Sequence, residues 1–345
     1  MGGRLGGMRL PRIKEPGEGY YHVISRVVDR QRLLDADEKE RLRALLHATE
    51  GFCGCQAVAY SLLDNHWHVL LHVPCREAVS DEELIRRLGF LYDKTLVQTV
   101  AATLTMYRQD GQHEAAEALR ARYVRRMYDL SEFAKTFKQR FTQSFNRRHG
   151  RKGTLWEERF KSVLVGGSEG ALAAVAAYID LNAVRAGMVQ DPKDYRFCGY
   201  AEALAGCGHA RDGLRKVLCG VGADADWRQV AERYRQLLYV TGEQRGVGED
   251  GKALRPGFSA EQVAEVRAAG GALRLDQLLR CRVRYFTDGV ILGTRAFVDE
   301  AFVRHRRSFS ARRMSGARPM RGGAWGDLCT VRRLRLSVIT VPDTG

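Results

Sequence analysis

The chain has 345 residues, enough to bury one large hydrophobic core or two smaller ones. It carries 56 Lys and Arg against 41 Asp and Glu, a formal net charge of +15, which suits a polyanionic partner, most commonly nucleic acid. No apolar run approaches the roughly 18–20 residues that span a bilayer, and the first residues lack the apolar core of a signal peptide. We therefore expect a cytoplasmic protein with no membrane partner.

The first part of the chain alternates between strand-like and helix-like patterns. After an N-terminus expected to be flexible over residues 1–15, the aromatic and β-branched stretch Tyr20–Val28 predicts a strand. Asp35–Ala48 follows as a helix with leucines on one face. Gln56–Leu62 and His66–Val73 then predict two strands joined by a tight turn.

A long helical stretch separates these strands from the next one. Residues 81–128 are poor in strand formers and are interpreted as a helical insertion. A helix is predicted from Ser131, as its N-cap, to His149, with a phenylalanine at every fourth position that we assign to the core. Arg159–Val165 predicts a fourth strand, and Ala171–Ala186 a helix closed by a glycine.

This order of elements predicts the fold class. Strands and helices in the order βαββ(α)βα indicate an α+β domain, an antiparallel sheet with helices packed on it, over residues 16–200. The remainder, 201–345, differs because glycine-rich stretches separate short helical segments, and its residues 304–335 hold ten arginines and one acid. We expect a basic, mainly helical C-terminal region that binds DNA. Either a helix-turn-helix within 259–300 or an ordinary helical domain fits its sequence.

The strand at 66–73 has a polar and an apolar face. Side chains alternate along a strand, so Trp67, Val69, Leu71 and Val73 share an apolar face that must pack on the core. His66 and His68 share the other face, close enough to bind one divalent ion. The alternative is a pair of half-exposed histidines with no metal, and the spacing alone does not exclude it.

The helix predicted at 171–186 carries a second polar group. Tyr178, Asn182 and Arg185 are four and seven residues apart and project from one face. They offer a phenol, a neutral oxygen ligand and a fixed cation, the groups that transfer of a phosphodiester requires. The alternative is a tyrosine packed between helix and sheet, with an asparagine near a helix end.

Three segments in this order resemble a known family. They are Asn65-His66-Trp67-His68-Val69-Leu70, Trp156-Glu157-Glu158-Arg159-Phe160-Lys161 and Tyr178-Ile179-Asp180-Leu181-Asn182-Ala183-Val184-Arg185-Ala186-Gly187. Together they resemble the REP-associated tyrosine transposases, single-tyrosine members of the HUH endonuclease superfamily, over about residues 15–200.

The resemblance implies a function and roles for individual residues. It implies a metal-dependent transposase that nicks and rejoins single-stranded or hairpin-forming DNA through a 5′-phosphotyrosine link and a free 3′-OH. His66, His68 and Asn182 would bind Mg²⁺ or Mn²⁺, and Tyr178 would be the nucleophile. A ferredoxin-like sheet and a nucleoid-associated location are expected, and a homodimer is left open. The chain departs from the family at Ala183, where proline is usual, which should alter helix-end rigidity rather than chemistry.

Basic residues gather between the two halves of the predicted site. Thirteen basic residues and four acids lie between Arg120 and Lys161, a surplus that favours a DNA groove. The predicted phosphate contacts are Arg147, Arg148, Arg151, Lys152 and Arg185. Two other functions stay open: an inactive DNA- or RNA-binding descendant of such an enzyme, and a metal-dependent hydrolase that uses water and needs no tyrosine.

Overall fold

The computed structural model describes residues 12–218, 226–239, 284–320 and 325–332. Within these residues, seven strands form one sheet in the order β2-β3-β1-β4-β5-β7-β6. The bounds of the strands are β1 (Gly19–Arg26), β2 (Gln56–Leu62), β3 (His66–Val73), β4 (Lys161–Val165), β5 (Ile291–Thr294), β6 (Arg318–Pro319) and β7 (Leu328–Val331). All neighbours pair antiparallel except β4 and β5, which are parallel.

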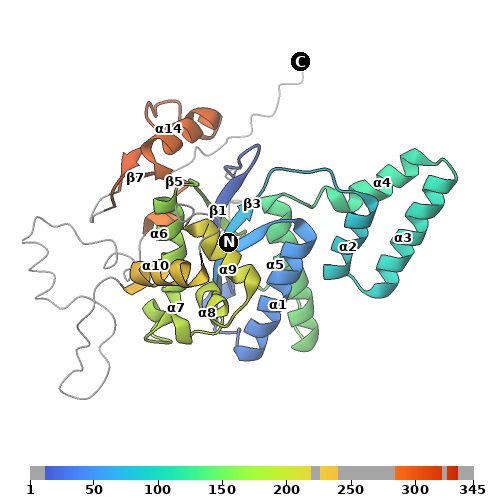
Figure 1. The fold of residues 1–345 in the computed structure, drawn as a ribbon, viewed down its shortest axis with the longest axis horizontal. Helices are drawn as coiled ribbons and strands as arrows, with labels where there is room; N and C mark the ends of the chain where they lie inside the picture. The colour runs from blue at the N-terminus through green and yellow to red at the C-terminus, as the bar shows by residue number, and fades with distance from the viewer. Residues whose placement is uncertain (1–11, 219–225, 240–283, 321–324, 333–345) are drawn as a thin grey trace, which may run out of the picture.

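Helices pack on both sides of this sheet (Figure 1). The helices of the N-terminal half are α1 (Ala36–Cys53), α2 (Asp81–Leu91), α3 (Lys94–Gln109), α4 (His113–Val124), α5 (Leu130–Arg148), α6 (Glu169–Asp180) and α7 (Asn182–Arg185). Those that follow are α8 (Gly199–Leu204), α9 (Gly208–Val217), α10 (Trp227–Tyr239), α13 (Arg284–Asp288) and α14 (Arg295–Arg304). Short 3-10 turns cover Val28–Arg30, Pro192–Asp194 and Arg306–Ser308.

Strand β3 separates two layers of side chains. Trp67 is fully buried against Phe137 of α5, with ring centroids 5.2 Å apart. Helix α1 packs beside α5, whereas α6 contacts β2 and β3 through the face that carries His68. Helices α2, α3 and α4 form a separate hairpin-like group that projects from the side of the molecule, joined to it through α1 and α2 (Figure 1). The apolar face predicted for β3 therefore packs on the core, and the face that carries His68 is buried as well, under α6.

The structure confirms the α+β class and moves several boundaries. β2 and β3 have the predicted bounds, and the 81–128 stretch is helical. The N-cap of α5 is Asp129 rather than Ser131, because the Asp129 carboxylate accepts the N–H groups of Ser131 and Glu132. The helix predicted over 171–186 is divided at Leu181, whose φ of −74° and ψ of 0° leave the helical range.

The C-terminal region is less separate than its sequence suggests. Strands β5, β7 and β6 extend the sheet beyond β4, in a region predicted to be mainly helical. Each has four residues or fewer, too few to show an alternating pattern. Gly166 and Gly293 let β4 and β5 approach, since a Cβ on Gly293 would lie 3.3 Å from the Gly166 Cα. Most of the region suggested for a helix-turn-helix and residues 1–11 of the N-terminus lie outside the described residues.

Candidate active site

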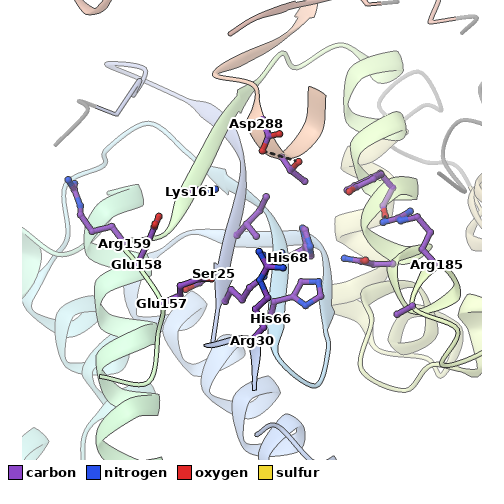
Figure 2. A pocket seen from close by; sticks show the side chains of 16 residues that line it. Ser25, Arg30, His66, His68, Glu157, Glu158, Arg159, Lys161, Arg185 and Asp288 are labelled. Atoms are coloured by element: carbon purple, nitrogen blue, oxygen red, sulfur yellow. Dashed lines mark hydrogen bonds between the residues drawn. The ribbon is translucent and has the colours of Figure 1, made fainter. Parts of the chain in front are cut away.

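His66 and His68 lie on the edge of a cavity of about 630 Å³ between β1, β3, β4 and the α6–α7 helices. Figure 2 shows the two imidazoles directed from β3 toward the wall that carries Arg185. His68 is 4% exposed and His66 is half-buried, and their ring centroids are 5.1 Å apart. The pairing of adjacent imidazoles that the alternation predicts is therefore present.

A third histidine, His22 of β1, orients His68. Antiparallel pairing aligns Ile24 with His68, which brings His22 diagonally beside it. The Nδ1 of His22 donates to the carbonyl oxygen of Phe286 at 2.9 Å, and its Nε2 lies 2.9 Å from the Nδ1 of His68. Burial lowers the pKa of His22 to about 4, and burial and neighbouring His22 lower the pKa of His68, so both rings are neutral at pH 7.

These contacts determine which nitrogen of each ring carries the proton. Because His22 donates from Nδ1, its Nε2 can only accept, and the Nδ1–H of His68 must be the donor. The unprotonated nitrogen of His68 is therefore Nε2. His66 is arranged in the same way, since its Nδ1 donates to the side-chain oxygen of Asn65 at 2.7 Å. Both neighbouring histidines thus have Nε2 as the nitrogen able to bind a metal.

The tyrosine helix supplies the opposite wall of the cavity. Tyr178, Asn182 and Arg185 all line it, although the helix is divided at Leu181. The helical hydrogen bonds continue across the division, because the Leu181 N–H donates to the carbonyl oxygen of Ala177 and the Arg185 N–H donates to that of Leu181. Gly187, with a φ of 70°, ends the segment as predicted. The shared face inferred from spacing is therefore retained.

Tyr178 is held by aromatic and cationic neighbours. Its ring lies 4.9 Å from that of Phe286 and 6.2 Å from that of His68. The guanidinium of Arg185 stacks on its ring at 3.9 Å and donates to the Tyr178 carbonyl oxygen at 2.5 Å. Only 3% of Tyr178 is exposed, so the ring has one packed position beside the histidine pair.

Asn182 brings an unsatisfied polar atom to the same place. The residue is 8% exposed, and its Nδ2 is buried without a hydrogen-bond partner among the described residues. Such an atom carries a free-energy cost in the protein alone. Rotation of the amide by half a turn about its terminal torsion would place its oxygen in that position. The amide of Asn182 together with Nε2 of His66 and His68 therefore fits a divalent cation with imidazole and oxygen ligands.

The mouth of the cavity is rich in charge. Its basic members are Arg26, Arg30, Arg159, Lys161 and Arg185, and its acidic members are Glu157, Glu158 and Asp288. The side that carries Arg159 and Lys161 lies across β1 from Arg185 (Figure 2). A surplus of cations around a metal-type site suits a phosphate-bearing substrate.

The other predicted phosphate contacts lie elsewhere. Arg147 and Arg148 end α5 outside the residues that line the cavity, and the turn after α5 carries Arg151 and Lys152. Arg148 is engaged by the buried carboxylate of Glu38, with Nη2 to Oε2 at 2.5 Å. Arg147 and Lys152 are exposed, whereas Arg151 is half-buried against the Phe145 ring.

Sequence reasoning missed His22 and the 286–288 segment. His22 stands in a strand-like stretch, but only the register of β1 against β3 places it beside His68. Phe286 accepts from His22 and packs on Tyr178, and Thr287 and Asp288 line the cavity. They lie more than a hundred residues beyond the tyrosine, and no local pattern connects them with the site.

Residues 17–109 match the family model described as "Transposase IS200 like". The match runs from the start of β1 to the end of α3, so it contains His22, His66 and His68 but stops before Tyr178. It confirms the resemblance to these transposases for that segment. A solved structure of a REP-associated tyrosine transposase bound to a REP hairpin is similar over 58% of this chain and 87% of that chain, with 15% identity and a TM-score of 0.38. No curated protein matches the sequence.

The described helices include none with the length and apolar character needed to cross a membrane.

Proposed function

We propose that the protein is a metal-dependent transposase that cleaves and rejoins single-stranded DNA with Tyr178 as nucleophile. One observation carries the proposal. Residues from β3 and from the α6–α7 segment, more than a hundred positions apart, meet in one cavity with a basic mouth. Its groups are a phenol, two imidazoles with the metal-binding nitrogen unprotonated, and a fixed guanidinium.

The reaction is an exchange of ester bonds at one phosphorus. The phenol oxygen of Tyr178 attacks the phosphorus, the bond to the 3′ oxygen breaks, and the phosphate stays on the 5′ oxygen of the next nucleotide. The phenol gives up its proton to solvent, and the departing 3′ oxygen gains one. Since one phosphate ester replaces another, the resulting 3′-OH can attack the phosphotyrosine and reseal a strand.

The chain's own residues bind and position the reactants. Arg185 fixes the Tyr178 ring by stacking on it and leaves a positive charge beside the position of the phosphate. Arg159 and Lys161 are placed to contact flanking phosphates. A Mg²⁺ or Mn²⁺ ion held by His66, His68 and Asn182 would polarise the scissile phosphate.

The DNA partner follows from the same chemistry. A strand has to bring its phosphate to a tyrosine that is 3% exposed, which favours a flexible single strand over a rigid duplex. Hairpin-forming repeats are the substrate class that the family resemblance suggests. The similar solved structure is that of a transposase bound to a REP hairpin.

A labelled single strand incubated with protein and Mn²⁺ tests the proposal on a denaturing gel. The labelled 5′-phosphate product should migrate with the protein, and mass spectrometry should find the phosphate on Tyr178. Tyr178→Phe removes one oxygen and should abolish the adduct while DNA binding persists. Tyr195→Phe is the matched control. The buried Tyr195 lies outside the cavity and donates its hydroxyl to the carbonyl oxygen of Leu62, so this variant should still form the adduct.

The other outcomes separate the rival functions. Cleavage without an adduct, unaffected by Tyr178→Phe, would show a hydrolase that activates water. Binding without cleavage in any divalent metal would show an inactive DNA- or RNA-binding protein. An adduct on a tyrosine other than Tyr178 would retain the reaction class and overturn the assigned nucleophile.

A further inference from the structure

A second group of metal-type ligands lies outside the cavity, where α1, α8 and α9 converge on the edge strand β2. His47, Glu50 and His209 each place one ligand atom within 4.8 Å of the others. His47 and Glu50 are one turn apart on α1, and His209 comes from α9. None of the three lines the cavity of the proposed active site.

The carboxylate of Glu50 lies between the two imidazoles. Its Oε2 lies 2.8 Å from Nδ1 of His47, and its Oε1 lies 2.9 Å from Nε2 of His209. The side chain of Glu50 is 3% exposed, whereas those of His47 and His209 are 32% and 44% exposed. The cluster therefore has a buried anionic base and an outer side that solvent can reach.

An outer ring of hydrogen bonds holds this arrangement. Glu202 of α8 lies 3.1 Å from Nε2 of His47, and it is itself held by the Arg43 guanidinium at 3.0 Å and the Tyr60 hydroxyl at 2.8 Å. Glu50 also accepts the backbone N–H of Ala57. A carboxylate that accepts one ring N–H of a histidine leaves the other ring nitrogen for a metal, an arrangement common around zinc. In His47 that other nitrogen is Nδ1, which faces Glu50.

We propose that His47, Glu50 and His209 form a structural binding site for Zn²⁺, with Glu202 orienting His47. Two imidazole nitrogens and one carboxylate oxygen are a typical ligand set for this ion, and solvent can supply a fourth ligand on the exposed side. Mg²⁺ prefers oxygen ligands and selects such a site less well. The ion would join α1 to α9 beside the edge strand and is independent of the proposed transposase chemistry.

The charges of the cluster are compatible with a cation. Although burial lowers it, hydrogen bonds to Glu202 and Glu50 raise the pKa of His47 to about 10. A hydrogen bond to Glu50 also raises the pKa of His209. Glu50 and Glu202 place two carboxylates beside the imidazoles, with the Arg43 guanidinium nearby. The two positive charges of a divalent ion would balance these two carboxylates.

The test uses the full chain with His66→Ala and His68→Ala, which removes the imidazoles of the cavity. Titration calorimetry with Zn²⁺ should give one site per chain, and Zn²⁺ should raise the melting temperature above that in EDTA. Adding His209→Gln removes a direct ligand, so it should weaken binding by more than the roughly 10- to 100-fold that loss of an outer-shell partner typically costs. Co²⁺ bound in place of Zn²⁺ should give the visible absorption of a four-coordinate site with nitrogen and oxygen ligands. His209→Gln should abolish this absorption.

His149→Gln is the matched control. His149 is 41% exposed and lies 3.0 Å from the buried carboxylate of Glu38, so it forms a similar surface histidine–glutamate pair without a second imidazole. This variant should bind Zn²⁺ as tightly as its parent. The proposal would be overturned if the parent bound no Zn²⁺. It would also be overturned if the His209→Gln variant, with the same melting temperature as its parent in EDTA, still bound Zn²⁺ with the parent's affinity. Neither result depends on DNA cleavage, so failure here is distinguishable from failure of the proposed function.

Discussion

His22 is expected to control metal binding in the cavity without touching the metal. His22→Phe keeps an aromatic ring in a fully buried position but removes the acceptor for the Nδ1–H of His68. The hydrogen bond between the two rings spans 2.9 Å, and its removal leaves a buried donor unpaired, at a cost of about 1–3 kcal/mol. His68 can regain a partner only by turning its ring or changing its tautomer, and either change disturbs Nε2.

The magnitude follows from that energy. A cost of about 1–3 kcal/mol corresponds to roughly 5- to 150-fold in an equilibrium constant, and loss of a group that orients a metal ligand typically weakens affinity by about 10- to 100-fold. We therefore expect Mn²⁺ to bind the cavity of His22→Phe about 10- to 100-fold more weakly. Titration calorimetry without DNA measures this, with His66→Ala defining the signal that belongs to the cavity.

His22→Gln separates orientation from packing. A glutamine oxygen can reach the position of the histidine Nε2 and accept from His68, so this variant should recover most of the affinity. In DNA cleavage assays at saturating DNA, His22→Phe should need a higher Mn²⁺ concentration to reach half of its maximal rate. The maximal rate itself should change less than this concentration. Wild-type Mn²⁺ affinity in a folded His22→Phe protein would refute the proposed proton arrangement.

Two further predictions concern stability and DNA affinity. Burial, with the nearby charge of Arg12, lowers the pKa of Lys138 to about 8, so the unfolded chain binds more protons than the folded one between that value and 10.5. The free energy of unfolding should therefore increase by up to about 3 kcal/mol as the pH rises through this window and Lys138 loses its proton. Urea unfolding of Lys138→Met should lack this increase. Equal pH profiles for the two proteins would contradict the prediction. Charge reversal of the exposed Arg147 and Lys152 should reduce the salt dependence of DNA binding, by about one unit of slope for each phosphate that the variant no longer neutralises. An unchanged slope in fluorescence anisotropy would show that the end of α5 and the turn after it do not contact DNA.

The sequence alone was sufficient for features that depend on local patterns. Alternation along 66–73 predicted that Trp67 packs on the core and that His66 and His68 share the other face, because a strand repeats every two residues. Helical spacing predicted that Tyr178, Asn182 and Arg185 lie on one side, and the division at Leu181 did not disperse them. Both inferences needed only the geometry of one element.

Features that depend on pairing between distant segments could not be predicted in this way. The register of β1 against β3 decides that His22 meets His68, and a shift of one residue would turn His22 to the opposite face. The four-residue strand β5 joins β4 in parallel and brings Phe286 to His22 and Tyr178, although a segment so short carries no periodic signal. The helix and sheet packing that places His209 beside Glu50 is likewise a matter of tertiary contacts. Local periodicity thus determined which side chains share a face, and only the packed structure decided which faces meet.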